Sequence, residues 1–178
     1  YAYTACIGVI WCFLPLFADI EFGLPGSRIG VLVTLGVFVS GILNLPMGFA
    51  ADRMDKKMLA CIGGLVSTLG MLLPFWSDSF GDLVLAVTIF GIGGGISMPS
   101  VMACAVIKGD EKNAMATVIS IMTVAHSLGM LTGSMAAGLA MDILELRLAF
   151  PIGTLIMFSG TLIFFTLFKQ GVIKDISD

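Results

Sequence analysis

The sequence predicts an all-α polytopic protein that crosses a lipid bilayer six times. Of its 178 residues, 58% are hydrophobic and only 12% are charged. The apolar residues form long uninterrupted runs, whereas a soluble protein of this size would show a polar face on most of its helices. The sequence also lacks the ten-residue segments of alternating polarity that are typical of a membrane β-barrel.

Six stretches are long enough to span a bilayer, because a hydrocarbon core of about 30 Å needs about 20 mostly apolar helical residues. None of them contains Asp, Glu, Lys or Arg. In chain order they cover residues 1–18, 29–51, 58–76, 83–107, 114–141 and 148–168. The segments between them are too short to fold as separate domains. The sequence therefore predicts one six-helix bundle over residues 1–168, followed by a cytoplasmic tail over residues 169–178.

Turn and capping signals stand at the ends of the predicted spans. Ser27 and Asp82 come shortly before apolar runs, where a side-chain oxygen can accept hydrogen bonds from the first backbone amides of a helix. The first span has no basic region before it and no small-residue cleavage site after it, so we expect no signal peptide. The chain starts at Tyr1 without an initiator Met, which leads us to expect a segment of a longer protein.

Basic residues divide unequally between the two sets of loops. One set, together with the tail, contains Arg53, Lys56, Lys57, Lys108, Lys112, Lys169 and Lys174. The other set contains Arg28 and Arg147. Because Lys and Arg accumulate on the cytoplasmic side of membrane proteins, we expect both ends of the chain in the cytoplasm, which agrees with an even number of spans. The short loops and the absence of targeting signals favour a plasma membrane, specifically a bacterial inner membrane.

Charge is concentrated between the second and third spans, where residues 48–57 read GFAADRMDKK. Each charged side chain costs about 2.5 to 3.5 kcal/mol at the centre of a bilayer, so this segment must lie outside the hydrocarbon. Its order resembles the loop signature of the major facilitator superfamily, G-x-x-x-D-R-x-G-[RK]-[RK], which lies between the second and third helices of each six-helix half. The matching residues are Gly48, Asp52, Arg53, Lys56 and Lys57.

The resemblance implies a role for this loop. In the family it is thought to hold the cytoplasmic ends of two helices together while the transporter faces outward, through an ion pair or a helix cap. We therefore expect the five matching residues to form a conformational latch. Asp55 stands where the signature has Gly. It either adopts the left-handed backbone conformation that Asp tolerates better than most residues or caps the third helix.

Two further positions favour the C-terminal half of such a transporter. In the N-terminal half of the family, the fourth helix commonly carries an Arg about four residues before the glycine that matches Gly91, but here that place holds Val87. The fifth helix of that half often has a Gly-Pro pair in exporters, where this chain has Gly133 and Ser134. The resemblance covers nearly the whole chain, and it implies a partner outside this sequence, the N-terminal six-helix half.

The resemblance also implies which helices surround the substrate. The first, second, fourth and fifth helices of each half line the central cavity in the family, while the third and sixth face lipid. The candidate cavity residues are therefore Trp11, Asn44, Ser97, Ser100, Thr123 and His126. His126 is the only histidine, and an ionisable side chain inside a membrane is a functional hypothesis by default. A neutral histidine bonded to a hydroxyl or carbonyl group would instead be purely structural, and Trp11 could equally face lipid.

Small residues recur at four-residue spacing on three of the predicted helices. The stripes are Gly36, Ser40, Asn44 and Gly48 on the second, Gly91 and Gly95 on the fourth, and Gly129, Gly133 and Ala137 on the fifth. Helices in lipid associate through such residues because their backbones can then approach closely. Close packing and the lining of a cavity are both compatible with this pattern.

The expected function is secondary active transport of a small solute by alternating access. The sequence has no GxxxxGK[ST] loop for a nucleotide, so an ion or solute gradient would supply the energy. With no Asp, Glu, Lys or Arg inside a span, a neutral or amphipathic solute fits better than a sugar phosphate, and efflux of drug-like organic compounds is one such function. We expect the lipid bilayer and the small-molecule substrate as partners, and no enzymatic activity, cofactor, metal or nucleic acid.

Two other functions remain open at this stage. The chain could be a half-size or accessory six-span protein that acts as a dimer. An intramembrane serine protease would also have six spans with a Ser and a His. Its nucleophile usually sits in GxSG with the His two helices later, whereas here Ser97 sits in GISM and His126 lies one helix later.

Overall fold

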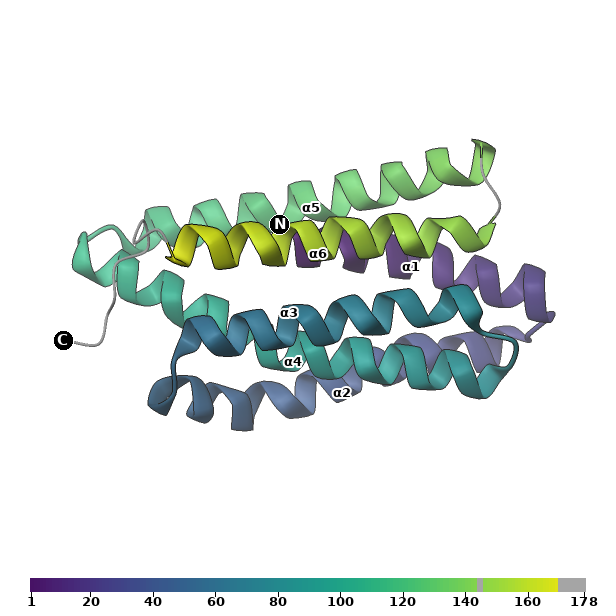
Figure 1. Ribbon diagram of the computed structural model, residues 1–178, viewed down its shortest axis with the longest axis horizontal. Coiled ribbons are helices and arrows are strands. Elements are labelled where there is room, and N and C mark those ends of the chain that lie inside the picture. Colours follow the sequence, from purple (N-terminus) through teal and green to yellow (C-terminus); the bar gives the residue numbers. More distant parts are fainter. Residues whose placement is uncertain (144–145, 170–178) are drawn as a thin grey trace.

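The computed structural model describes residues 1–143 and 146–169. This part of the chain contains six long helices, two short 3₁₀ helices and no strand, as Figure 1 shows. The long helices are α1 (Ala2–Phe22), α2 (Gly26–Arg53), α3 (Lys56–Leu72), α4 (Phe80–Glu111), α5 (Met115–Ile143) and α6 (Ala149–Lys169), and the short ones are η1 (Leu73–Trp76) and η2 (Leu146–Leu148). The predicted all-α class is confirmed. The predicted tail lies outside the described residues beyond Lys169.

Each of the six long helices, α3 together with η1, is long and apolar enough to cross a membrane. Several continue past the uncharged runs into polar residues. For example, α1 extends through Asp19 and Glu21 to Phe22. Its C-cap is Gly23, whose φ of 57° lies in the left-handed region that glycine adopts without strain. The amide of Gly23 donates to the carbonyl oxygen of Asp19 at 2.9 Å, which closes the helix end.

In space, the helices of the first half of the chain (α1 to α3) are interleaved with those of the second half (α4 to α6). α1 packs against α5 and α6, whereas α4 packs against α2 and α3. The first helix of each half (α1 or α4) thus packs against the second and third helices of the other half. Contacts between α3 and α6 also join the two groups. This reciprocal pattern is that of an internal structural repeat, a common construction in membrane transporters.

The contact between α2 and α4 depends on glycines. A β-carbon on Gly91 would stand 2.6 Å from the carbonyl oxygen of Gly36. One helical turn further on, a β-carbon on Gly95 would stand 2.6 Å from the β-carbon of Leu43. Both distances are shorter than any side chain tolerates, so α4 approaches α2 more closely than a helix with larger residues could.

The neighbouring glycines of α4 face other helices. A β-carbon on Gly93 would stand 2.7 Å from the carbonyl oxygen of Gly63 on α3, and one on Gly94 would overlap the hydroxyl group of Tyr3 on α1. The run GIGGG is therefore the place where α1, α2 and α3 all reach α4. Close packing against three helices accounts for these glycines.

The counterpart contact between α1 and α5 is built in the same way. A β-carbon on Gly8 would stand 2.5 Å from the carbonyl oxygen of Met130, and one on Gly133 would stand 2.7 Å from the carbonyl carbon of Ala5. The stripe predicted on the fifth helix thus faces α1.

The helix starts differ in two places from the prediction. α2 begins at Gly26 after Pro25, without a side-chain cap, so the prediction of Ser27 as its N-cap is wrong. Proline fixes the extended φ that precedes a helix. Ser79, and not Asp82, is the N-cap of α4. Asp82 completes a capping box instead, since the Ser79 amide donates to its carboxylate at 2.9 Å and its own amide donates to the Ser79 hydroxyl at 3.3 Å.

Candidate functional site

A large cavity lies toward the end of the bundle where α4 turns into α5. It has a volume of about 570 Å³, and its wall is mostly apolar. α1, α3, α4, α5 and α6 all contribute residues to it. Three of the six predicted cavity residues line it, namely Ser97, Thr123 and His126.

The other predicted cavity residues lie elsewhere. Trp11 and Asn44 line a second cavity of about 250 Å³, between α1, α2 and α4. Trp11 is 50% exposed at the edge of this cavity. Ser100 lines neither cavity. It is fully buried, and its hydroxyl group donates to the carbonyl oxygen of Ile96 at 2.9 Å.

The polar groups of the large cavity differ in their hydrogen bonds. The Thr123 hydroxyl donates to the carbonyl oxygen of Ile119 on its own helix at 3.0 Å, which is the usual way for a hydroxyl to be satisfied inside a membrane. Within residues 1–143 and 146–169, the buried hydroxyl oxygen of Ser97 has no hydrogen-bond partner. The partly exposed ring of His126 has none either in the same part of the chain. Ser97 and His126 are therefore the groups that a bound molecule could engage.

Sequence reasoning missed the contribution of α3 and α6 to this wall. We expected these two helices to face lipid, yet Gly64 of α3 and Thr161 of α6 both line the large cavity. They also contact each other, because a β-carbon on Gly64 would stand 2.5 Å from the Thr161 hydroxyl oxygen. A glycine pair at positions 63 and 64 was the available signal, since a helix surrounded only by lipid gains nothing from residues without side chains.

Methionines form much of the same wall and were not predicted. Met98 and Met102 on α4, Met122 on α5 and Met157 on α6 all line the large cavity. Thioether side chains are flexible and polarizable, so they adapt to ligands of different shapes. The described residues that line this cavity include no Asp, Glu, Lys or Arg.

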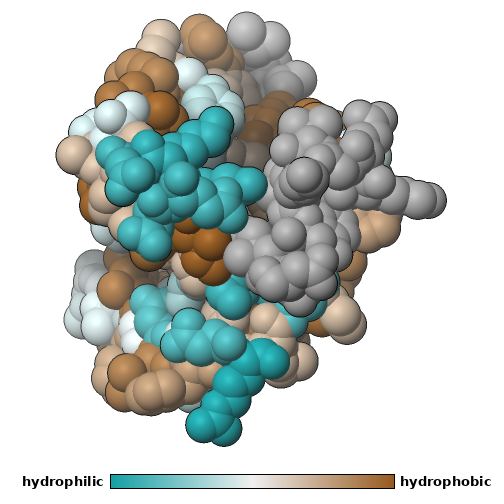
Figure 2. Space-filling view, turned by 90° about the vertical axis from the view of Figure 1, so that its left-hand side faces the viewer, coloured by the Kyte–Doolittle hydropathy of each residue, from teal (hydrophilic) through white to brown (hydrophobic). Residues whose placement is uncertain are grey.

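The charged loop between α2 and α3 is at the same end of the bundle, where Figure 2 shows hydrophilic residues gathered. Asp55 is the N-cap of α3, and its carboxylate accepts a hydrogen bond from the Lys57 amide at 2.9 Å. Its φ of −63° excludes the left-handed alternative. Asp52 and Arg53 are both exposed. Lys56 is partly exposed, whereas Lys57 is buried at 4% exposure.

The environment of Gly48 is open. Among the residues that the structure describes, nothing lies within 4 Å of a β-carbon built on it. No ion pair joins Asp52 and Arg53 within the same residues. The arrangement thus leaves Gly48, Asp52 and Arg53 accessible to a partner that approaches from outside this bundle.

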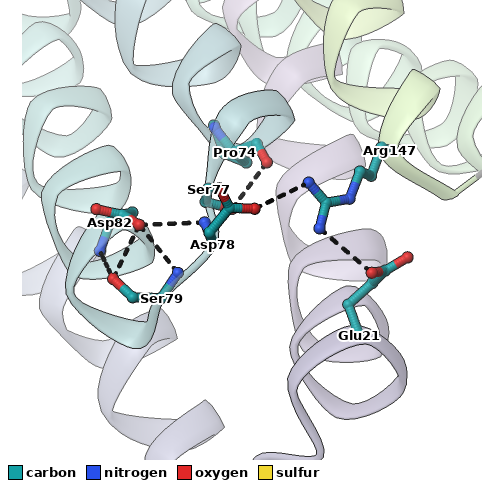
Figure 3. A network of polar contacts seen from close by, with 7 residues as sticks. All are labelled: Glu21, Pro74, Ser77, Asp78, Ser79, Asp82 and Arg147. Atoms are coloured by element: carbon teal, nitrogen blue, oxygen red, sulfur yellow. Dashed lines mark hydrogen bonds and ion pairs between the residues drawn. The ribbon is translucent and has the colours of Figure 1, made fainter.

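Arg147 ties three segments together at the opposite end. Its guanidinium group lies 3.4 Å from the Glu21 carboxylate at the end of α1 and 3.5 Å from the Asp78 carboxylate before α4. Figure 3 shows the guanidinium group between these two acids. It also lies over the ring of Phe17, at 5.9 Å from the ring centroid. The contacts connect the two groups of helices at this end.

Comparison with known proteins gives a consistent result over nearly the whole chain. Residues 2–175 match the sequence model of the Major Facilitator Superfamily. The quinolone resistance protein NorA of Staphylococcus aureus is 30% identical over 95 residues, which cover 53% of this chain and 24% of NorA. An uncharacterized MFS-type transporter of Bacillus subtilis, YhcA, is 30% identical over 82 residues, which cover 46% of this chain and 15% of YhcA.

Proposed function

This chain belongs to the major facilitator superfamily of membrane transporters, and we propose that it moves a small organic solute across a plasma membrane by alternating access. In this proposal it forms the C-terminal six-helix half and works against an N-terminal half of the same protein. Only 6% of the residues in the apolar stretch of α2, and likewise of α5, are buried in this bundle. This supports the proposal, because the sides of α2 and α5 that face away from α4 and α1 are free to contact the other half. The transport is driven by an ion or solute gradient.

The observation that carries the proposal is the cavity of about 570 Å³ with its apolar wall and few polar groups. Such a site is typical of small-molecule binding, in which apolar surface supplies affinity and a few polar groups fix orientation. Ser97 and His126 are the two groups that would orient the solute. Because no charged side chain from the described part of the chain lines the wall, the proposed solute is neutral or amphipathic. The name of NorA, a quinolone resistance protein, supports efflux of drug-like compounds.

The charged loop would act as the latch on the cytoplasmic side. Lys56 and Arg53 belong to the basic end of the bundle, and this excess of positive charge supports a cytoplasmic location for that end and for both ends of the chain. Gly48, Asp52 and Arg53 are open toward a partner, as a contact with the other six-helix half requires. A bacterial inner membrane is the proposed location, in keeping with the bacterial relatives.

The alternative of a serine protease has little support. No hydrogen bond joins Ser97 to His126 in the described part of the chain, although both line the same cavity. A half-size protein that pairs with a second copy would use the same uncovered surfaces of α2 and α5, and cross-linking of the protein in native membranes would reveal it.

The test is efflux of a fluorescent quinolone from cells that express the full-length transporter. We expect His126→Asn and Ser97→Ala to reduce efflux several-fold at equal protein level. Ser159→Ala is the matched control, since Ser159 is exposed on α6 and its hydroxyl bonds its own helix. If His126→Asn leaves efflux unchanged from about pH 5 to pH 8, the range in which histidine titrates, His126 has no part in transport.

A further inference from the structure

One side of the segment formed by α3 and η1 is exposed, and every exposed side chain there is large and apolar. The exposed residues of Lys56–Trp76 are Met58, Ile62, Leu65, Leu69 and Trp76. The first four recur at spacings of four, three and four residues, which place them on one face of a helix. Because that face includes no polar side chain, it is suited to hydrocarbon and not to water.

The glycines of α3 lie on its packed side, where a β-carbon would meet another helix: Gly63, Gly64 and Gly70. For example, a β-carbon on Gly70 would stand 2.7 Å from the α-carbon of Phe90. α2 differs, since nothing among the described residues lies within 4 Å of a β-carbon on Gly30 or Gly48. Membrane helices use glycine where another helix approaches closely. The uncovered surface of α2 is therefore suited to a protein helix, and the exposed side of α3 to acyl chains.

The length of this segment matches the thickness of a bilayer. From Lys56 to Trp76 the chain rises by about 30 Å, given 1.5 Å per residue, and the hydrocarbon core of a bilayer is about 30 Å thick. Polar residues stand just beyond both ends, since Asp55 precedes the segment and Asp78 follows it. Trp76 therefore stands where hydrocarbon gives way to water, at the end of the bundle opposite the charged loop.

The side chain of Trp76 has the chemistry of that boundary. It is 62% exposed, and its ring packs edge-on against Phe75 with 5.2 Å between the ring centroids. None of the described residues accepts a hydrogen bond from its indole N–H. Tryptophan is enriched at membrane–water interfaces because its large ring is apolar while its N–H needs a polar partner. The ester carbonyl and phosphate oxygens of a phospholipid would supply that partner.

We propose that Trp76 is an interfacial anchor, which binds the ester and phosphate region of phospholipids and fixes the height of α3 in the membrane. The exposed side of α3 then contacts acyl chains along its length. This surface goes beyond solute transport, and it is measured without a solute. A failed anchor would leave the efflux experiment unaffected, and failed efflux would leave the lipid measurement valid.

Trp11 is the matched control, because the chain has two tryptophans and both are exposed. Trp11 is 50% exposed, but it borders the cavities between α1 and α2. In the proposed transporter the other half covers this side of the bundle, so Trp11 should be shielded from lipid. If exposure in this bundle alone decided lipid contact, both tryptophans would meet lipid.

The experiment measures tryptophan fluorescence of the full-length protein in phosphatidylcholine vesicles, because bromine atoms on a lipid quench a tryptophan that they contact. The bromine stands either near the ester end or near the methyl end of the acyl chains. Tryptophans elsewhere in the full-length chain are replaced by Phe. Trp11→Phe then leaves Trp76 as the emitter, and Trp76→Phe leaves Trp11. Trp11→Leu or Trp76→Leu replaces a Phe variant that does not fold.

We expect bromine near the ester end to quench Trp76 several-fold more strongly than bromine near the methyl end. Quenching of Trp11 should be several-fold weaker than that of Trp76 with the ester-end lipid. Strongest quenching of Trp76 by the methyl-end lipid would place it inside the hydrocarbon and refute the anchor. Absence of quenching would refute it as well, because protein would then cover Trp76. Equal quenching of both tryptophans by the ester-end lipid would show that contact follows exposure alone.

Discussion

A β-carbon on Gly63 would stand 2.7 Å from the carbonyl oxygen of Gly93, and a β-carbon on Gly93 would stand 2.7 Å from the carbonyl oxygen of Gly63. The two glycines thus face each other where α3 crosses α4, and neither helix has room for a methyl group there. Backbone contact at this distance gives dispersion attraction and weak Cα–H···O contacts, the main forces between helices in lipid.

Gly93→Ala should therefore destabilise the bundle. We expect a loss of about 1–3 kcal/mol, the usual range for overpacking. The measurement is the fraction of monodisperse protein that remains after heating in detergent. Gly41→Ala is the control, because nothing lies within 4 Å of a β-carbon at Gly41 and alanine favours a helix more than glycine does. Equal melting of the two variants would contradict the reciprocal contact.

The N-cap of α3 leads to a second prediction. Asp55→Ala should cost about 0.5–2 kcal/mol, because the amides of Lys57 and Met58 lose their acceptor. Hydrogen exchange at these two amides should accelerate. Asp55→Asn should behave like the wild type, since Asn caps equally well. Acceleration by Asp55→Asn as strong as that by Asp55→Ala would mean that the charge of Asp55, and not its cap, protects the helix.

The Arg147 contacts should be unequal in strength. Asp78 is 86% exposed in its ion pair, whereas Glu21 is 34% exposed, and solvent screens an exposed pair more strongly. A double-mutant cycle with Arg147→Met should give a coupling of up to about 1 kcal/mol with Glu21→Gln and less with Asp78→Asn. Thermal midpoints at low and high salt would measure it. A stronger coupling with Asp78 would contradict the argument from exposure.

The proposed orientation can be tested by thiol labelling. In a background with Cys12→Ser, a cysteine in place of Asp78 should react with a membrane-impermeant maleimide in intact cells, and a cysteine in place of Lys56 should react after the membrane is opened. The two positions lie at opposite ends of the bundle. Reaction at position 56 from outside intact cells would reverse the orientation.

Efflux should fall when a bulky side chain fills the large cavity. Met102→Trp adds a bulky ring to the wall and should lower efflux of a fluorescent quinolone strongly at equal expression. Leu155→Trp adds a similar ring at an exposed position of α6 away from the cavity and away from the uncovered surfaces of α2 and α5, and it should leave efflux near the wild-type rate. Similar efflux in both variants would place the solute path elsewhere.

The helices were predictable from the sequence because hydrocarbon imposes a length and a composition on any segment that crosses it. The sequence left two alternatives for Asp55, a left-handed backbone conformation or the N-cap of the third helix. Its φ of −63° and its hydrogen bond from the Lys57 amide show that it is the cap. The exchange of helices between the two halves was not predictable, because the GIGGG run presents glycine on several faces at once. Nothing in one sequence tells which face meets α1, α2 or α3.

The candidate cavity was only partly predictable for a related reason. Periodicity places Thr123 and His126 near one face of a helix, but it does not fix the rotation of that helix against its neighbours. Ser97 joins them in the large cavity, whereas Trp11 and Asn44 line the smaller one. The methionines gave no signal, since each of them alone is an ordinary apolar residue.

Because α1 packs against α5 and α6, the bundle cannot be completed until the second half of the chain has been synthesised. Ala5 packs against Gly133, and at about 5–20 residues per second a ribosome needs roughly 6 to 26 seconds to synthesise the intervening chain. During this interval the newly inserted α1 has none of its native neighbours from the second half. Its glycine-bearing surface must be sheltered by lipid or by the insertion machinery until α5 and α6 arrive, and a chain released after α3 is expected to be degraded.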